Sequence, residues 1–418
     1  MKGAGAVQPI AVTGLGVESC VGSDLDGFWS AVRSGRSGHR ALPGELAEAS
    51  GCAVGGVVDF EEPDVVGGSE LRRMSRFQQM HLAVVHKALV DAGVKDCAGH
   101  ALVCGTSLGG FSEMPGLFSV RDGVWRSTDR LAPLKILSHT PATVTAQLLG
   151  FGGRCLTIGT ACAASTDAIA LACDHIALGR AEQVVASGVE CWISSLALRS
   201  FSRLGAVSKR SGEEAATASR PFDVDRDGLV PAEGAAALHL ESVGSAVSRG
   251  ARIYGLIVGT GSTCDAHHPT RPLPGGQQAA QAIRLALSDA GIAPSDVDHV
   301  DTHGTSTKDN DPVEALAIRA ALGDRADQVT FSAGKSILGH TLGACGALET
   351  AAALLALRNG FAPPIANLRR TDPDCGMDLA GRHGITRDIR VLLKINLGFG
   401  GHNSALVLRS APGEVAAA

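Results

Sequence analysis

Short apolar runs that end in glycine or a polar turn alternate along the chain with longer runs rich in alanine and leucine. The short runs are typical of buried β-strands, and we expect strands within residues 9–16, 101–110, 181–190, 254–262, 297–305 and 392–401. The longer runs predict helices within residues 72–93, 165–179, 275–291 and 346–360, and several of these end on a glycine that suits a helix C-terminus. Strands that alternate with helices predict an α/β protein.

A stretch rich in serine, glycine and arginine, from Ser242 to Arg252, separates two of the expected strands near the middle of the chain. We place a domain boundary there, which divides the chain into residues 1–250 and 251–418. The two parts share a gross order of strands and helices, although no repeat is visible in residue identity. With 418 residues, 45% of them hydrophobic, the chain is long enough to bury a large core.

Glycine is abundant, with 53 copies against a single tyrosine, and it crowds the apolar segments together with alanine. Small side chains let the backbones of neighbouring layers approach closely. We therefore expect layers in close contact and some helices buried on every face.

The bulk charge and the cysteines narrow the function classes. A net charge of −5 gives no indication of a nucleic-acid or membrane-surface binder. The 11 cysteines are scattered, odd in number and free of CxxC pairs, which argues against a disulfide framework and against a zinc site. The N-terminal stretch enters an expected strand without a signal-peptide pattern. We expect a protein of the reducing cytoplasm that does not enter a membrane.

Cys162 differs from the other cysteines in its context. It lies where a strand-like run turns sharply into a helix built almost wholly of small and apolar residues. Free N–H groups and the helix dipole favour a thiolate at a helix N-terminus, which makes such a cysteine nucleophilic. The alternative is a packed core cysteine, which is what most free cysteines are.

Two histidines lie in segments that lead into expected helices. His303 follows an apolar strand and precedes a helix, and His340 lies in a glycine-punctuated loop that enters another apolar helix. Each histidine alone has a structural interpretation. Together with a cysteine at a helix start they supply a nucleophile and two donors for acyl transfer.

Other segments add supporting residues. Lys335 lies five residues before His340 and is placed to order a carboxylate such as Glu349. The GFGG stretch around Phe399 is a flexible loop whose backbone N–H groups suit an oxyanion. By contrast, the segment VTGLGVES has Ser19 at the third glycine position of a GxGxxG fingerprint, and we reject a dinucleotide site there.

Six segments in this order resemble the β-ketoacyl synthase family of the thiolase superfamily, in its elongating branch. The likeness spans nearly the whole chain and rests on TACAAS around Cys162, RPFDVDRDGLVPAEGAA, DAHHPTRPLPGG, HGTSTKDNDPVE, GKSILGHTLGACGALE and GFGGHN. His340 decides the branch, because initiating members have asparagine there. The resemblance implies a duplicated five-layered αβαβα thiolase-like fold, a dimer with its active site between the two halves, and no metal or organic cofactor.

The resemblance also implies roles for individual residues. Cys162 is expected to be the acylated nucleophile, and His303 and His340 are expected to bind the malonyl thioester carbonyl and promote decarboxylation. The backbone N–H groups of Cys162 and Phe399 are expected to form the oxyanion hole, and Phe399 also matches the family's gating phenylalanine. The remaining matches are the pantetheine-binding Thr305 and Thr307 and the supporting charged pair Lys335 and Glu349.

The chain departs from the family pattern in two places. It has PAEGAAA from Pro231 where the family often has GEGAG, and Asp301-Thr302 before His303 where many members have Glu-Ala or Asn-Ala. Neither departure touches Cys162, His303 or His340. They affect what the resemblance implies about the substrate pocket.

The family resemblance implies an acyl carrier protein, loaded with acyl or malonyl groups, as the partner. Such a carrier is acidic, so a chain of net charge −5 needs a local basic patch to attract it. ELRRMSRFQQ resembles the family's docking helix and AVSKRS its second basic element, which makes Arg72, Arg73 and Arg210 the candidates. We expect a discrete type II component that forms a homodimer, or a heterodimer with a homologous chain-length-factor subunit.

Three other functions remain open at this stage. A chain-length factor has the same fold but commonly replaces the nucleophile with glutamine, which Cys162 disfavours. A thiolase or acyltransferase uses the same cysteine without decarboxylation, which the pair of histidines disfavours. A cysteine hydrolase of another fold leaves the remaining segments unexplained.

Overall fold

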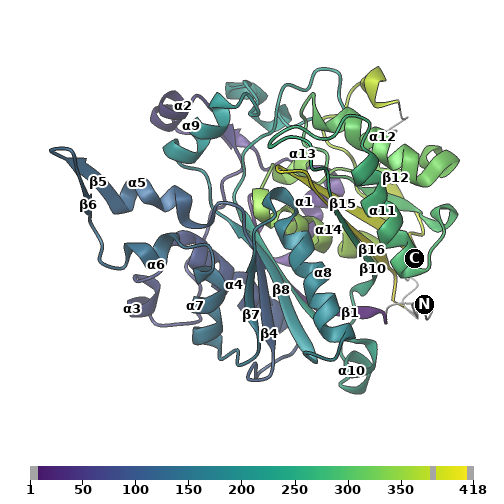
Figure 1. Ribbon diagram of the computed structural model, residues 1–418, viewed down its shortest axis with the longest axis horizontal. Helices are drawn as coiled ribbons and strands as arrows, with labels where there is room; N and C mark the ends of the chain where they lie inside the picture. The colour runs from purple at the N-terminus through teal and green to yellow at the C-terminus, as the bar shows by residue number, and fades with distance from the viewer. Residues whose placement is uncertain (1–7, 377–382, 412–418) are drawn as a thin grey trace.

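A mixed sheet of ten strands forms the centre of the computed structural model, which describes residues 8–376 and 383–411 (Figure 1). The sheet runs in the order β12-β11-β15-β16-β10-β1-β9-β8-β4-β7. Its N-terminal strands are β1 (Ile10–Ser19), β4 (Ala101–Gly105), β7 (Cys155–Ile158), β8 (Gln183–Glu190) and β9 (Gly234–Ser242). Its C-terminal strands are β10 (Gly255–Cys264), β11 (His299–Asp301), β12 (Thr330–Ser332), β15 (Val391–Gly398) and β16 (His402–Arg409).

The two halves of this sheet have the same topology. In each half the first strand pairs antiparallel with the last, the last pairs antiparallel with the one before it, and the two remaining strands continue in parallel to the edge. A short antiparallel pairing of β1 with β10 joins the halves. The expected duplication is therefore confirmed. The boundary at residue 250 falls in the connection between β9 and β10 and remains our proposal.

Helices complete the layers. Outside the N-terminal half lie α4 (Arg76–Asp91) and α7 (Thr140–Leu149), and outside the C-terminal half lie α11 (Gln277–Ala290) and α12 (Asn310–Leu322). Between the halves, α8 (Ala164–Ala177) packs against α14 (Cys345–Asn359). Every residue of α14 from Cys345 to Leu357 is buried, as expected for a central helix of small and apolar residues. This arrangement is the five-layered αβαβα fold.

Shorter elements fill the connections. The helices are α1 (Leu25–Ser34), α2 (Gly44–Ser50), α3 (Gly68–Leu71), α5 (Met114–Leu117), α6 (Ala132–Ile136), α9 (Ser195–Arg203), α10 (Val243–Ser248) and α13 (Lys335–Leu338). The strands are β2 (Arg40–Ala41), β3 (Val54–Gly55), β5 (Phe118–Arg121), β6 (Val124–Ser127), β13 (Phe361–Ala362) and β14 (Ile385–Thr386). In the described part of the chain no helix is both long and apolar enough to cross a bilayer.

The structure contains all the expected strands and helices but moves one boundary. The helix expected from residue 72 begins at Arg76, because the side chain of Gln78 accepts the N–H of Ser75 (2.9 Å) and so caps the helix there. Arg72 and Arg73 therefore lie in a turn before the helix. Strand β9, which the sequence analysis missed, reads as GAAALHLES and has helix-like composition. It is a strand because β1 and β8 pair with both of its edges.

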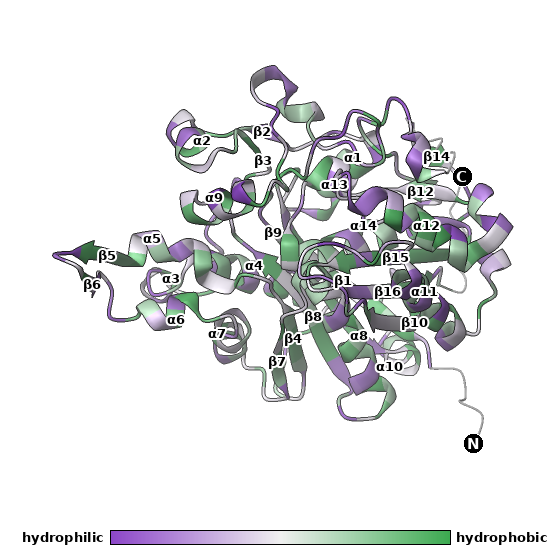
Figure 2. Ribbon diagram, turned by 45° about the horizontal axis from the view of Figure 1, so that its top comes forward, coloured by the Kyte–Doolittle hydropathy of each residue, from purple (hydrophilic) through white to green (hydrophobic). Residues whose placement is uncertain are grey.

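The rejected dinucleotide motif has a packing explanation. A Cβ atom at Gly14 would lie 2.2 Å from the carbonyl oxygen of Ala88, and one at Gly16 would lie 2.1 Å from that of Val84, both in α4. The second half repeats the device, with Gly259 and Gly261 of β10 against α11. These glycines let a helix backbone touch a strand backbone, as the glycine-rich composition predicted (Figure 2 shows the apolar strands beneath the helices).

This close approach generates a prediction about stability. Gly16→Ala should lower the free energy of unfolding by about 3 kcal/mol or more, because helix α4 must move away from β1. The measurement is urea denaturation followed by circular dichroism. Gly244→Ala in α10 is the matched control, since a Cβ there meets no atom within 4 Å, and it should leave stability unchanged or raise it. Equal behaviour of the two variants would contradict the packing argument.

Candidate active site

Cys162 lies in a strained turn at the centre of the molecule. Strand β7 ends at Ile158, and a short 3₁₀ helix, η2 (Ala161–Ala163), leads directly into α8. Ala161 has a positive φ of 50°, a conformation that residues with a side chain rarely adopt and that must be held by its surroundings. The Cys162 side chain is 4% exposed. The predicted cysteine at the start of a buried helix is therefore present.

Asp167, in the first turn of α8, ties this turn to the other half. Its carboxylate accepts hydrogen bonds from the hydroxyls of Thr160 (2.5 Å), Ser262 (3.0 Å) and Ser404. Thr160 precedes the strained Ala161, while the two serines belong to β10 and β16. Asp167 thus holds the nucleophile turn in place, a role that sequence reasoning missed because its three partners are scattered along the chain.

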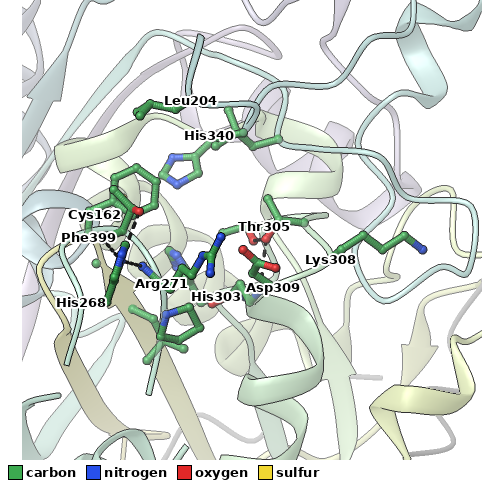
Figure 3. A pocket seen from close by; sticks show the side chains of 18 of the residues that line it. Cys162, Leu204, His268, Arg271, His303, Thr305, Lys308, Asp309, His340 and Phe399 are labelled. Carbon is green, nitrogen blue, oxygen red and sulfur yellow. Dashed lines mark hydrogen bonds between the residues drawn. The ribbon is translucent and has the colours of Figure 1, made fainter. Parts of the chain in front are cut away.

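The structure brings Cys162, His303 and His340 together, and their side chains line one cavity (Figure 3). The sulfur and one ring nitrogen of each histidine all lie within 4.8 Å of one another. His303 follows β11, and His340 follows α13. The two imidazole rings are 5.7 Å apart between centroids and perpendicular, at 89°. All three side chains are buried.

The hydrogen bonds of His303 fix its tautomer. Its Nδ1 lies 3.0 Å from Nζ of Lys335 and 3.2 Å from Nδ2 of Asn396, and both of these groups are donors. Nδ1 must therefore accept, so the proton is on Nε2, the nitrogen that remains for the cavity. Burial, together with the positive charge of Lys335, lowers the pKa of His303 well below its ordinary value. The ring is neutral and offers an N–H donor.

His340 has the same tautomer for a different reason. The backbone N–H of Leu342 donates to its Nδ1 at 3.0 Å, so Nε2 carries the proton. Leu342 has a positive φ of 42°, a conformation that its surroundings must hold in place. The backbone N–H of His340 donates to the oxygen of Val230 (2.7 Å), and its carbonyl oxygen accepts from Nε1 of Trp192 (3.2 Å). Both histidines thus offer an Nε2–H donor.

This donor arrangement does not fit a metal ion. Cysteine and histidine at such distances are zinc-type ligands, but a metal-bound histidine needs a bare nitrogen toward the ion and an acceptor for its other N–H. Here Nδ1 of each ring receives donors, from Lys335 and Asn396 in one case and from Leu342 in the other. The hydrogen bonds therefore direct N–H groups, and not lone pairs, toward the cavity.

The expected pair of Lys335 and Glu349 is present and almost fully buried. Nζ of Lys335 donates to Oε1 of Glu349 (2.6 Å) and to the carbonyl oxygen of His303 (2.7 Å). Burial by itself would raise the pKa of Glu349, but Lys335 and Lys394 outweigh it and lower that pKa. The carboxylate is therefore ionised. Lys394 and Asn396, both on β15, also contact Glu349 and were missed by the sequence analysis.

The glycine loop lies beside the cysteine. A Cβ at Gly398 would lie 2.9 Å from the oxygen of Thr160 and 3.3 Å from the nitrogen of Cys162, so β15 ends against the nucleophile turn. Within the described residues, neither the N–H of Cys162 nor that of Phe399 has a hydrogen-bond acceptor. Two free N–H groups beside a nucleophile can stabilise an oxyanion.

A cavity of about 350 Å³ gives access to these groups. Thr305 and Thr307 line it, with their hydroxyl oxygens 2.8 Å apart. The ring of Phe399 lies in the wall and stacks on Phe201, at 6.3 Å between centroids and 10° between planes. A cavity lined by hydroxyls, an aromatic ring and the reactive sulfur suits a chain with amide and apolar parts.

The three arginine candidates do not line this cavity. Arg72 and Arg73 are exposed in the turn between α3 and α4, and Arg73 pairs with Glu70 at 3.6 Å. Arg210 is 18% exposed in its side chain, and its guanidinium donates to Glu214 (2.8 Å) and to the carbonyl oxygen of Asp225 (2.9 Å). Arg72 and Arg73 thus form one pair, while Arg210 belongs to a separate network of acids.

Buried acids that accept backbone N–H groups are the main feature that sequence reasoning missed. Glu314 accepts the N–H of His303 (2.5 Å) and of Gly304 (2.8 Å). Glu190 accepts the N–H of Ser107 (2.7 Å), Leu108 (3.1 Å) and Gly343 (3.0 Å), so it holds the turn that carries Leu342. Burial raises the pKa of both carboxyls to about 7, although their N–H donors lower it. For Glu190, the only indication in the sequence was its place at the end of the apolar run VVASGVE.

The position of Glu190 generates a prediction. Glu190→Gln preserves shape but places an amide NH₂ against backbone N–H groups, so it should lower the free energy of unfolding by about 1–3 kcal/mol. Urea denaturation checks the stability. Hydrogen exchange should become faster in residues 340–345 because the turn loses its acceptor. Glu48→Gln, on the exposed face of α2, is the control and should change stability by less than about 0.5 kcal/mol. Unaltered exchange in 340–345 would contradict the role of Glu190.

Comparison with family models gives two matches. The model of the Beta-ketoacyl synthase, N-terminal domain, matches residues 7–246, and that of the Beta-ketoacyl synthase, C-terminal domain, matches residues 254–369. The chain is 35% identical over 407 residues to 3-oxoacyl-[acyl-carrier-protein] synthase 2 of Synechocystis sp., covering 96% of this chain and 97% of that protein. It is 34% identical over 433 residues to Actinorhodin polyketide putative beta-ketoacyl synthase 1 of Streptomyces coelicolor, covering 99% and 91%.

Solved structures agree over nearly the whole chain. The ishigamide ketosynthase/chain length factor superposes with a TM-score of 0.88 at 33% identity, covering 97% of this chain and 100% of that one. The ketosynthase complex AntDE:AntF, with a type II acyl-carrier protein and a bound hexaketide, superposes with a TM-score of 0.87 at 30% identity, covering 97% and 99%. At these identities the likeness concerns more than the fold.

Proposed function

This chain belongs to the β-ketoacyl synthase family, and from that premise we propose which of its atoms carry out the reaction. The protein is a β-ketoacyl-acyl-carrier-protein synthase of type II fatty acid or polyketide biosynthesis, an acyltransferase that condenses an acyl thioester with malonyl-carrier and releases CO₂. The observation that carries the proposal is the meeting of one cysteine sulfur with two imidazole nitrogens within 4.8 Å.

In the first half-reaction Cys162 is the nucleophile. Its sulfur attacks the carbonyl carbon of the acyl-carrier thioester, and the oxygen becomes an oxyanion beside the free N–H groups of Cys162 and Phe399. The carbon–sulfur bond to the carrier breaks, the carrier thiolate leaves, and it takes the proton that Cys162 lost. The acyl group is then bound to the enzyme, and the emptied carrier departs.

In the second half-reaction His303 and His340 receive the malonyl thioester. Their Nε2–H groups donate to its carbonyl oxygen. The bond between the methylene carbon and the carboxylate breaks, CO₂ leaves, and the electron pair becomes an enolate on that oxygen. A donor aimed at developing charge in a buried site contributes about 2.7–4 kcal/mol to the rate. Neutral rings suit this role because neither has to lose or gain a proton.

Condensation completes the cycle. The methylene carbon attacks the acyl carbonyl on Cys162, the new carbon–carbon bond forms, and the cysteine thiolate is expelled. One proton is taken up per turnover to restore the thiol. The β-ketoacyl chain leaves on the carrier that brought the malonyl group. No redox partner is needed, because the bond to CO₂ supplies the electron pair.

The partners follow from this chemistry. The acyl carrier protein brings both substrates on a pantetheine arm. Thr305 and Thr307, which line the cavity, are our candidates for binding the amides of that arm. We also propose a cytoplasmic location, which the eleven free cysteines support.

The enzyme is a dimer, formed with an identical chain or a homologous chain-length-factor subunit. Two described surface features suit an interface. The hairpin of β5 and β6 projects from the body of the molecule (Figure 1) and exposes Val120, Val124 and Trp125, the last at 69%. Strand β7 is an edge of the sheet with all four residues partly exposed.

Separating the half-reactions tests the proposal. Cys162→Ala should abolish the covalent acyl-enzyme, because no nucleophile remains, and should leave the fold intact, because alanine suits this small-residue helix. His303→Ala and His340→Ala should still form acyl-enzyme at least partly, while malonyl-carrier decarboxylation falls roughly 100-fold or more, the loss of one donor. Intact-mass analysis measures the acyl-enzyme, and CO₂ release measures decarboxylation.

Two results would contradict the assignment. Covalent acyl-enzyme on Cys162→Ala would mean another nucleophile. Equal and severe loss of acylation in both histidine variants would indicate a cysteine–histidine pairing of the hydrolase kind. Carriers of varied chain length and unsaturation, used in the same mass assay, identify the acyl class.

Carrier docking gives a separate prediction. We propose Arg72 and Arg73 as the exposed cations that attract the acidic carrier, with Arg210 as the third candidate although acids already engage it. Arg72→Glu with Arg73→Glu should raise KM for acyl-carrier protein and flatten its dependence on salt. Turnover of a small acyl-pantetheine should be nearly unchanged. A matched loss on both substrates would show damage to the fold or the active site instead.

A further inference from the structure

Strand β15 presents three residues of one face to the active site. Lys394, Asn396 and Gly398 alternate along the strand, so they share the face that looks toward α14 and the nucleophile turn η2. Gly398 meets the cysteine turn and Asn396 contacts His303. Lys394 is fully buried, with 0% exposure, in a segment that otherwise reads as an apolar strand. A lysine is almost never so deeply buried without partners.

The partners of Lys394 are two buried acids and a carbonyl. Its Nζ lies 2.8 Å from Oε2 of Glu349 and 3.2 Å from Oδ2 of Asp301, and it donates to the oxygen of Ile395 at 2.7 Å. The other oxygen of Asp301 accepts the hydroxyl of Ser332 at 2.7 Å. Asp301 is the residue at which this chain departs from the Glu or Asn of many family members. Lys394 and Asp301 therefore form a buried pair added to the pair of Lys335 and Glu349.

Glu349 links the two pairs. Its Oε1 accepts from Lys335, and its Oε2 accepts from Lys394 and from Nδ2 of Asn396 (2.9 Å). Lys335 and Asn396 are the two donors that hold Nδ1 of His303, and both rest on this one carboxylate. Whatever fixes the carboxylate therefore fixes the tautomer of His303. Removing Lys394 would leave Oε2 of Glu349 with Asn396 as its donor and would leave Asp301 without its cation.

We propose that Lys394, paired with Asp301, is a positioning residue for decarboxylation: it anchors Glu349 so that Lys335 and Asn396 keep the Nε2–H of His303 aimed at the substrate. This inference rests on the proposed role of His303. Lys394 does not touch the substrate and acts through Glu349. Burial raises the pKa of Asp301, and the charge of Lys394 opposes that effect, so Lys394 favours the ionised acid in a cluster of two lysines and two acids.

The charge of Lys394 has a second effect on His303. Several titratable groups surround that ring, each from a different element: Cys162, Glu314, Lys335, His340, Glu349 and Lys394. Burial lowers the pKa of His303, and Lys335, His340 and Lys394 lower it further. Loss of Lys394 removes one of these causes, so the pKa rises. A protonated His303 has no acceptor for Lys335 and is repelled by it, so decarboxylation is lost as pH falls through the raised pKa.

The test is the pH profile of malonyl-carrier decarboxylation, measured as CO₂ release by the full-length enzyme from the lowest pH at which it stays folded up to about pH 9. Lys394→Met should lower the rate at neutral pH by about tenfold. It should also move the acid limb, the part of the profile where the rate falls as pH falls, upward by about one pH unit. Lys394→Met with Asp301→Asn restores the balance of charge. The double variant should return the limb toward its wild-type position, while its rate stays below wild type because Glu349 still lacks one donor.

The controls distinguish this inference from the proposed function. Arg249→Met removes the cation from the buried carboxylate of Glu241, remote from the site, and should cost stability without moving the limb. A shifted limb in that control, or an unshifted limb in Lys394→Met, overturns the inference. If Lys394→Met does not fold, the decarboxylation rate of the double variant is the test. A full wild-type rate in the double variant overturns the inference. A wild-type enzyme that does not decarboxylate malonyl-carrier would overturn the proposed function instead.

Discussion

The active site depends on one close approach between two helices. A Cβ atom at Gly346, in the first turn of α14, would lie 2.1 Å from Oγ1 of Thr166 in the first turn of α8. Because no side chain stands there, the N-terminal ends of the two central helices touch. The turn that precedes α8 carries Cys162, and the turn that precedes α14 follows His340. Any larger residue at this contact would separate the sulfur from the imidazole, whatever else the sequence retained.

The charged side chains around this contact are buried, and each is stabilised by an oppositely charged partner and not by solvent. Buried lysines and acids normally cost stability, and they persist where each finds a partner. Around His303 two lysines face two acids, and their hydrogen bonds decide which nitrogen of the ring bears the proton. At His340 the backbone N–H of Leu342 does the same. The enzyme thus obtains two identical donors from two unrelated local structures, which is how an enolate oxygen can be held from two sides.

The sequence predicted the parts whose signal is local. Cys162 was recognisable from a strand that turns into a helix of small residues, and the strand and helix order followed from apolar periodicity. The supporting acids were not recognisable in this way. Asp167 and Glu190 each bind residues far away along the chain, and each looks like an ordinary acid in its own segment. Lys394 is the one charged residue of strand β15, and only the folded chain shows that Glu349 and Asp301 enclose it. Arg210 looked free, although Glu214, the acid that engages it, is only four residues away along the chain.

The repeated topology also repeats the nucleophile turn. Thr160-Ala161-Cys162 before α8 has its counterpart in Thr341-Leu342-Gly343 before α14, with the same positive φ at the middle residue. In the second copy a side chain at Gly343 would collide with the backbone of Ser107. The second turn therefore has no room for a side chain at the position that Cys162 occupies in the first. One copy of the turn is the chemical centre, and the other is part of the frame that holds it.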